Sequence, residues 1–303
     1  MPILFVVGVF VFLLIHITPG DPASYMLGPS ASAAEVDHLR TVLGLNLPLY
    51  QQFVIWLQHA LRGDLGQSIF MGIPVSTSIL QRLEPTFLIT ILAVCFEVAI
   101  GIPAGILAAT HRNSWVDQAT MAVSVLGLSV PSFWLGLNLI LVVGVRLRWL
   151  PVAGYVPLAE GDLWGTVRTV LMPSFSLGFI SAALIARLTR SSMLEVLGLD
   201  FVRTARAKGL PASMVIWRHA LGNAILPVLT AVGNSFTVLL GGLVVTEQVF
   251  AIPGVGQLVI NSVLRRDYPV IQGTVLYIVC LYIVINVMVD VLYAAADPRI
   301  KYA

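Results

Sequence analysis

The sequence predicts an all-α integral membrane protein with six transmembrane helices, and its composition is the first reason. Of the 303 residues, 58% are hydrophobic and only 11% are charged, and the mean hydropathy is +0.92. Typical soluble domains contain about 45–50% apolar and about 25% charged residues. Several apolar runs also reach the roughly 20 residues that a helix needs to cross the hydrocarbon core of a bilayer. Lipid must therefore solvate much of the surface.

The first apolar run begins at the second residue. It lacks the basic flank of a signal peptide, and no small-residue cleavage site follows it, so we expect a retained span. The predicted spans are Pro2–Thr18, Thr86–Ala109, Ala119–Val145, Met172–Leu188, Ile225–Val249 and Val270–Ala296.

No repeat or long polar linker divides the chain, so we expect one membrane domain over residues 1–303. Its expected parts are the first span 1–18, an extracytoplasmic loop 19–85, a five-helix core 86–296 and a cytoplasmic tail 297–303.

Six spans place both termini on one side, and the basic residues predict that this side is the cytoplasm. With an inside N-terminus, nine of the 17 basic residues lie in inner segments and five lie in short outer segments. The long first loop holds three more, and long loops count for little in this rule. The nine inner residues are Arg112, Arg187, Arg190, Arg203, Arg206, Lys208, Arg218, Arg299 and Lys301.

The first loop contains apolar residues at helical spacing, which predicts an interfacial helix. This helix either packs on the outer ends of the spans or contributes to substrate docking. Its apolar residues are Phe53, Trp56, Leu57, Ala60 and Leu61.

The most basic stretch lies between the fourth and fifth predicted spans. Asp200 suits a helix start, Arg206 and Lys208 suit the carbonyl end, and Gly209 suits the left-handed position that follows. Pro211 fits the first turn of another helix. We therefore predict two short helices that meet at a sharp corner around Gly209.

The first of these helices combines small residues with basic ones. Thr204, Ala205 and Ala207 would let it seat closely in a groove on an acidic soluble partner. The alternative is an ordinary loop whose positive charges only hold the membrane topology.

Sequence motifs here resemble a known family. The run Arg203-Thr-Ala-Arg-Ala-Lys-Gly209, followed by Arg218-His-Ala-Leu-Gly-Asn-Ala-Ile-Leu-Pro227, is similar to the cytoplasmic loop of dipeptide, oligopeptide and nickel ABC-importer permeases. The broader permease signature has Glu-Ala-Ala where this chain has Arg203-Thr-Ala, a feature that resembles the peptide branch. The resemblance continues in Ser129–Gly136, Trp149–Gly154, Glu247–Gly254, Arg266–Gln272 and Asp290–Arg299.

The resemblance implies a type I ABC importer permease in a bacterial inner membrane, carrying a small peptide, glutathione or a nickel chelate. It implies a second homologous permease in a heterodimer, two ABC ATPase subunits, an extracytoplasmic binding protein and surrounding lipid as partners. A net charge of +2 gives no reason to expect nucleic acid. The residues that would form the ATPase-coupling helix are Arg203, Thr204, Ala205, Arg206, Ala207, Lys208, Gly209 and Leu210.

The chain itself lacks a phosphate-binding loop. Lys208 and Lys301 are its only lysines, and neither follows a glycine. We therefore expect no enzyme activity, cofactor or metal in this chain, and we expect partner ATPases to bind ATP and Mg²⁺.

Polar groups inside predicted spans are expensive and are candidates for function. Glu97 is either a gating or relay carboxylate or a protonated or hydrogen-bonded packing residue. Asp290, near the inner end of the last span, is either a functional carboxylate or the partner of a neighbouring cation. Cys95 and Cys280 lie in apolar runs and are interpreted as packing residues. Asn234, Ser235 and Thr237, with Asn138, either line an aqueous path or form interhelical hydrogen bonds.

Two other functional classes fit the sequence less well. A secondary transporter driven by protons through Glu97 or Asp290 would favour inverted repeats with paired broken helices, which the sequence does not display. An intramembrane hydrolase would need partners for His16, and no serine, cysteine or carboxylate pair stands at suitable spacing.

Overall fold

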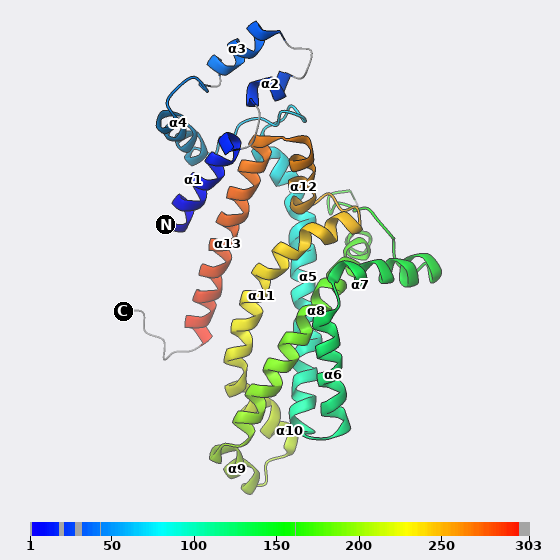
Figure 1. Ribbon diagram of the computed structural model, residues 1–303. Helices are drawn as coiled ribbons and strands as arrows, with labels where there is room; N and C mark the ends of the chain where they lie inside the picture. The colour runs from blue at the N-terminus through cyan, green and yellow to red at the C-terminus, as the bar shows by residue number, and fades with distance from the viewer. Residues whose placement is uncertain (1, 18–20, 28–31, 43, 161, 297–303) are drawn as a thin grey trace. The chain divides into compact units, whose positions relative to one another are not determined.

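The computed structural model describes residues 2–17, 21–27, 32–42, 44–160 and 162–296, and these residues form helices joined by loops (Figure 1). The chain divides into two compact units. One contains residues 1–83 and 257–284, and the other contains residues 84–256 and 285–303. The predicted all-α class is confirmed within the described residues.

The first unit contains the N-terminal helices and the C-terminal hairpin. Its elements are α1 (Pro2–Ile17), α2 (Pro22–Leu27), α3 (Ala33–Val42), α4 (Leu49–Leu61), the start of α5 (Val75–Thr110), most of α12 (Val255–Arg265) and the first part of α13 (Tyr268–Ala296).

The predicted interfacial helix is α4, and it packs against α1. The Phe12 ring centroid lies 5.3 Å from that of Phe53 and 5.8 Å from that of Trp56. His16 Nε2 lies 3.0 Å from Gln52 Oε1, which adds a polar contact to the aromatic ones. The apolar side of α4 is therefore used for packing on α1, one of the two interpretations of its sequence pattern.

A buried carboxylate holds this unit together. Asp267, at the corner between α12 and α13, accepts hydrogen bonds from Ser68 Oγ (2.5 Å) and from the backbone N–H groups of Ile69 and Phe70 (3.2 Å each). Three donors satisfy a charge that burial would otherwise penalise. Below them, Val75 and Val270 belong to one buried apolar cluster.

The second unit is a helical bundle built around α8. Beyond α5 it contains α6 (Trp115–Ser129), α7 (Ser132–Leu139), the π-helical turn η1 (Ile140–Arg146), α8 (Leu163–Leu197), α9 (Asp200–Ala207), α10 (Ala212–Met214), the π-helical turn η2 (Val215–Ala220) and α11 (Leu221–Val249). In Figure 1, α8 runs beside α6 and α11, and it packs against both helices. About 67% of its apolar stretch is buried, against 22–28% for the other long helices.

Glycines allow α5 and α8 to approach closely. A Cβ added to Gly101 would lie 2.8 Å from the carbonyl oxygen of Ala182, and one added to Gly105 would lie 2.5 Å from that of Ala186. Small residues at membrane-helix interfaces permit such backbone proximity, and van der Waals packing then stabilises the pair.

Two predicted boundaries are corrected by the structure. Helix α5 begins at Val75, 11 residues before the predicted start at Thr86, and α8 extends over Leu163–Leu197 rather than Met172–Leu188. The added turns are rich in polar residues, which a search for apolar runs excludes. In α5 they are ordered by packing, because Val75 and Ile79 are buried.

The predicted third span, Ala119–Val145, is not one continuous helix. Helices α6 and α7 with η1 meet at an angle of 99°. The cause lies at Val130 and Pro131, which have extended backbone dihedral angles. Proline disfavours helical geometry at the residue before it and cannot donate a backbone hydrogen bond, so the chain turns there.

Four helices in the described residues are long and apolar enough to cross a membrane, and the bent pair would make a fifth. The long helical stretches are Val75–Thr110, Leu163–Leu197, Ala212–Val249 and Tyr268–Val289. The first predicted span corresponds to α1, an apolar helix of 16 residues.

Candidate functional site

The predicted corner in the basic segment is present in the structure. Helix α9 ends at Ala207, and Gly209 then adopts a φ of +76° before α10 begins. Glycine is suited to this left-handed conformation because it has no Cβ to clash with the backbone. Pro211 stands at the N-cap of α10, one position before the expected first turn.

Asp200 stands at the start of α9, as expected, but it is not the N-cap residue. Leu199 occupies the N-cap, and no side chain caps the helix there. Asp200 lies in the first turn, where its Oδ1 accepts a hydrogen bond from Arg203 Nη1 at 3.3 Å. A negative charge in the first turn still interacts favourably with the helix dipole.

Helix α9 has one buried face and one exposed face. Val202 and Ala205 are buried in an apolar cluster with residues of α5, α8, η2 and α11, and Leu210 packs against this cluster. The buried face therefore ties α9 to several long helices at once. The exposed residues on the opposite side are Phe201, Arg203, Thr204, Arg206, Ala207 and Lys208.

A buried ion pair fixes the α6 end of the same bundle. Arg190 Nε and Nη2 donate to Asp117 Oδ1 (2.5 Å) and Oδ2 (2.7 Å), and the side chain of Asp117 is only 5% exposed. The two parallel bonds join α8 to the start of α6. Bidentate pairs of this kind add geometric specificity as well as energy.

Glu97 is fully buried and lies against α11. Ser235 Oγ donates to Glu97 Oε2 at 2.7 Å. Glu97 Oε1 has no hydrogen-bond partner among the described residues. The structure thus brings together two of the predicted polar residues, a carboxylate of α5 and a hydroxyl of α11.

The other predicted pathway residues lie apart from this contact. Asn234 is exposed and Thr237 is half-buried, on a different side of α11 from the buried Ser235. Asn138 lies on α7, where its Nδ2 donates to the Trp134 carbonyl at 2.7 Å within the same helix. Asp290 falls outside the described side chains.

Sequence reasoning missed another buried carboxylate inside a predicted span, Glu247 of α11. It is fully buried, and its Oε1 accepts a hydrogen bond from Thr86 Oγ1 at 2.6 Å. The Thr86 hydroxyl oxygen in turn accepts from the backbone N–H of Val255 at 2.9 Å. Gly254 stands so close that an added Cβ would overlap the Glu247 carboxyl group. The signal was available, since Glu247 is an ionisable residue inside the predicted span Ile225–Val249.

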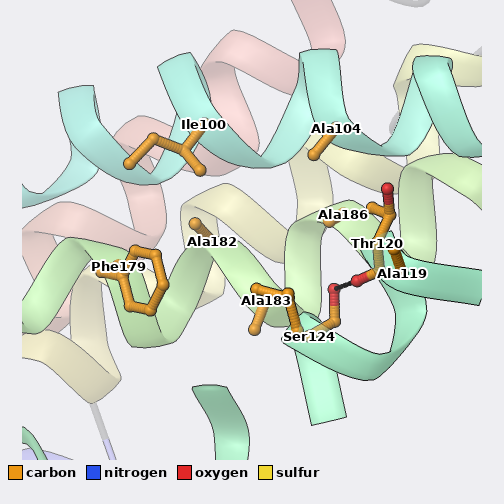
Figure 2. Close-up of a pocket in the computed structure, with 10 residues that line it drawn as sticks. Ile100, Ala104, Ala119, Thr120, Ser124, Phe179, Ala182, Ala183 and Ala186 are labelled. Atoms are coloured by element: carbon orange, nitrogen blue, oxygen red, sulfur yellow. Dashed lines mark hydrogen bonds between the residues drawn. The ribbon is translucent and has the colours of Figure 1, made fainter. Parts of the chain in front are cut away.

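A cavity of about 290 Å³ lies between α5, α6 and α8. Figure 2 shows its apolar character: Ile100 and Ala104 come from α5, and Phe179 and several alanines come from α8. The hydroxyls of α6 turn to their own helix, because Ser124 Oγ donates to the Thr120 carbonyl at 2.9 Å. None of the described lining residues is ionisable, so the cavity offers nothing to a charged solute.

Comparison with known proteins connects these features to a family. Residues 101–302 match the description "Binding-protein-dependent transport system inner membrane component". Residues 1–69 match "Binding-prot-dependent transport system membrane comp, N-term".

Two relatives match along nearly their whole length. The glutathione transport system permease protein GsiC of Escherichia coli K12 is 45% identical over 302 residues, covering 100% of this chain and 96% of that protein. The "Probable peptide ABC transporter permease protein y4tP" of Sinorhizobium fredii is 45% identical over 296 residues, covering 98% and 94%.

Solved structures share the fold. A chain of the MetNI methionine ABC transporter in an inward-facing conformation aligns with a TM-score of 0.61, covering 72% of this chain and 95% of that one. Sequence identity is 19%, so this likeness concerns the arrangement of helices.

Proposed function

We infer the function of this chain from its family, because it belongs to the binding-protein-dependent transport system inner membrane components. It is a permease subunit of an ABC importer. We propose that it forms half of the translocation pathway and carries a small peptide or a related solute such as glutathione, the substrates in the names of its relatives. The proton-coupled alternative finds no support among these relatives.

The observation that carries the proposal is the two-sided character of α9. Its exposed face presents three cationic residues, and its buried face joins the apolar cluster of α5, α8, η2 and α11. A partner that moves the exposed face must also move the buried one. We propose that the segment Arg203–Leu210 docks on an ABC ATPase subunit through its exposed residues. Ala205, which the sequence placed in the docking surface, is buried with Leu210 against the bundle, and we propose that these two transmit the opening and closing of the ATPase to the spans.

The chain would work within a larger assembly. The proposed partners are a second homologous permease, two ATPases that bind ATP and Mg²⁺, and an extracytoplasmic binding protein. ATP binding would bias a two-state membrane dimer toward the outward-open state, and hydrolysis would reset it. In this scheme the partner ATPases carry out all of the nucleotide chemistry.

The proposed topology has six crossings and both termini in the cytoplasm. Helix α1, the four long helices and the bent pair α6–α7 would supply the crossings. The corner at Gly209 then faces the cytoplasm, and the loop between η1 and α8 faces outward. The excess of basic residues in the inner segments supports this orientation.

The proposal is tested by gentle extraction of the tagged chain from its native membrane, followed by mass spectrometry of the co-purified proteins. Two ATPases and a second permease should accompany it. Arg206→Glu should reduce ATPase recovery, because it reverses a charge on the exposed face of α9. Arg112→Glu, on the predicted cytoplasmic turn outside α9, is the matched control and should leave recovery unchanged. A chain that purifies alone and transports solute in liposomes without ATP would overturn the proposal.

A further inference from the structure

The loop between η1 and α8, described over residues 147–160, is tightly anchored for an irregular segment. The backbone N–H of Trp149 donates to the Val143 carbonyl, and that of Gly154 donates to the Phe250 carbonyl, each at 3.0 Å. Glu84 Oε1 accepts from the Tyr155 hydroxyl at 2.5 Å and from the backbone N–H of Leu158 at 2.7 Å. These bonds hold the loop in one conformation, as a preorganised binding site requires.

The loop, Gly144 and the start of α8 line an open surface hollow of about 460 Å³, which we call the loop cavity. This volume falls within the roughly 300–1,000 Å³ that small-molecule sites occupy. Its walls combine an apolar surface with two guanidinium groups. The residues concerned are Leu150, Pro151, Val152, Val156, Arg148 and Arg168.

The charge of the loop cavity is unbalanced. Arg148 and Arg168 line it, and no carboxylate does among the described residues. The nearby acidic groups accept hydrogen bonds from the loop and from α8 instead. Asp162 Oδ1 accepts from the Gly165 N–H at 2.8 Å, and Glu84 holds the loop as described above. Two like charges facing one small space repel each other, and an anion between them would relieve that repulsion.

The fold positions the side chain of Arg168 and the backbone of Arg148. Arg168 Nη2 donates to the Trp149 carbonyl at 2.9 Å, which uses one of its five N–H donors and orients the planar group. Arg148 adopts a φ of +56°, a left-handed conformation that few residues other than glycine adopt. The backbone N–H groups of Leu147 and Trp149, on either side of it, donate to carbonyls of η1 and hold this conformation.

The location adds a second argument. In the proposed topology these arginines face outward, where the positive-inside rule disfavours basic residues in short segments. Membrane insertion therefore does not explain the two arginines in this outer segment, whereas recognition of an anion does. Guanidinium groups match carboxylates with paired hydrogen bonds.

We propose that the loop cavity binds the carboxylate of a small solute with an apolar body, as in the C-terminal residue of a short peptide. The two arginines hold the carboxylate, and Leu150, Pro151, Val152 and Val156 contact the apolar part. The inference rests on the proposed function, since it gives that function an outer site for the substrate on this chain.

The test uses the purified importer complex without its binding protein. N-acetyl-leucine and N-acetyl-leucinamide serve as probes, because they differ only in carboxylate against amide. Phenylglyoxal modifies accessible arginines, and peptide mass spectrometry reports the rate at each one. N-acetyl-leucine should slow modification of Arg148 and Arg168, and the amide should not. The exposed Arg146, which does not line the cavity, is the internal control and should be modified at one rate throughout.

Arg168→Gln should weaken protection of Arg148 by roughly tenfold, because it removes charge-assisted hydrogen bonds to the probe. Arg146→Gln is the matched variant and should leave protection intact. Equal protection by both probes, or protection by neither, would overturn the proposal. A separate sample receives the substrate-free binding protein in place of the small probes. Protection by this protein but not by N-acetyl-leucine would also overturn the proposal, because the acidic group would then belong to the protein partner.

This assay reads binding without transport, so its failure is distinguishable from failure of the proposed function. An importer that co-purifies with its ATPases and transports with ATP, yet shows no carboxylate protection, refutes the loop cavity alone. If the unmodified chain recovers no ATPase and shows no ATP-driven uptake, the permease assignment itself is refuted.

Discussion

Gly209 illustrates how a single residue determines the shape of the proposed coupling surface. Its φ of +76° turns the chain from α9 into α10. A Cβ at this position would meet no atom within 4 Å, so crowding is not the reason for glycine. The requirement is purely conformational, and it can be tested without disturbing the packing around it.

Gly209→Val should uncouple ATP hydrolysis from uptake while leaving insertion intact. A side chain at a left-handed position costs about 1–2 kcal/mol, and β-branched residues tolerate it least. Gly209→Asn is the control, because asparagine accepts positive φ more readily. The measurement is uptake per ATP hydrolysed in proteoliposomes. Normal coupling in the valine variant would refute the requirement for the corner.

Gly254 is constrained in the opposite way, by crowding against the buried Glu247 carboxyl group. Gly254→Ala should lower the midpoint of thermal unfolding in detergent, since overpacking costs about 1–3 kcal/mol. Gly241→Ala, on α11 with no atom within 4 Å of the new Cβ, should be neutral or slightly stabilising. Equal midpoints for the two variants would contradict the account of Glu247 as a tightly enclosed group.

The close contact between α5 and α8 predicts different effects for substitutions at two neighbouring positions of α5. Gly105 faces the α8 backbone, whereas Ala104 faces the cavity between α5, α6 and α8 (Figure 2). Gly105→Val should therefore destabilise the protein by about 1–3 kcal/mol or more. Ala104→Val adds volume where space exists and should be tolerated. Thermal unfolding with size-exclusion chromatography measures both, and similar losses would argue against close helix contact.

Sequence patterns predicted the apolar middle of each long helix better than its ends. Hydropathy marks the lipid-facing part of α5, but the turns from Val75 to Glu84 are ordered by tertiary contacts of Val75 and Ile79. No local pattern contains that information. Proline inside an apolar run indicates a possible kink at Pro131, but the sequence does not give its size, which is 99° in the structure.

The parts of the candidate site formed by residues adjacent in sequence were predictable. The parts formed by residues far apart in sequence were not. The basic helix and the corner at Gly209 follow from residues adjacent in sequence. The contacts Glu97–Ser235 and Thr86–Glu247 join residues 138 and 161 positions apart. Only the folded chain brings these together, so Ser235 could not be separated from Asn234 and Thr237 beforehand.

For the whole molecule, the orientation in the membrane is the central expectation. A variant without Cys95 and Cys280 can carry one new cysteine at an exposed alanine, either Ala153 in the loop before α8 or Ala212 at the start of α10. A membrane-impermeant maleimide should label Ala153→Cys in right-side-out vesicles and Ala212→Cys only in inside-out ones. The reverse pattern would invert the topology and place the loop cavity in the cytoplasm.

The separation of Glu97 from Ser235 also has a consequence for synthesis. Ribosomes add roughly 5–20 residues per second, so about 7–30 s pass between the addition of the carboxylate and that of the hydroxyl. Throughout this interval α5 lacks Ser235, and until α8 has been made it also lacks the surface that covers Gly101 and Gly105. An acidic side chain at the centre of a membrane helix costs about 2.5–3.5 kcal/mol on insertion scales. The nascent chain must therefore tolerate Glu97 before its fold exists, and a slow ribosome would lengthen that exposure.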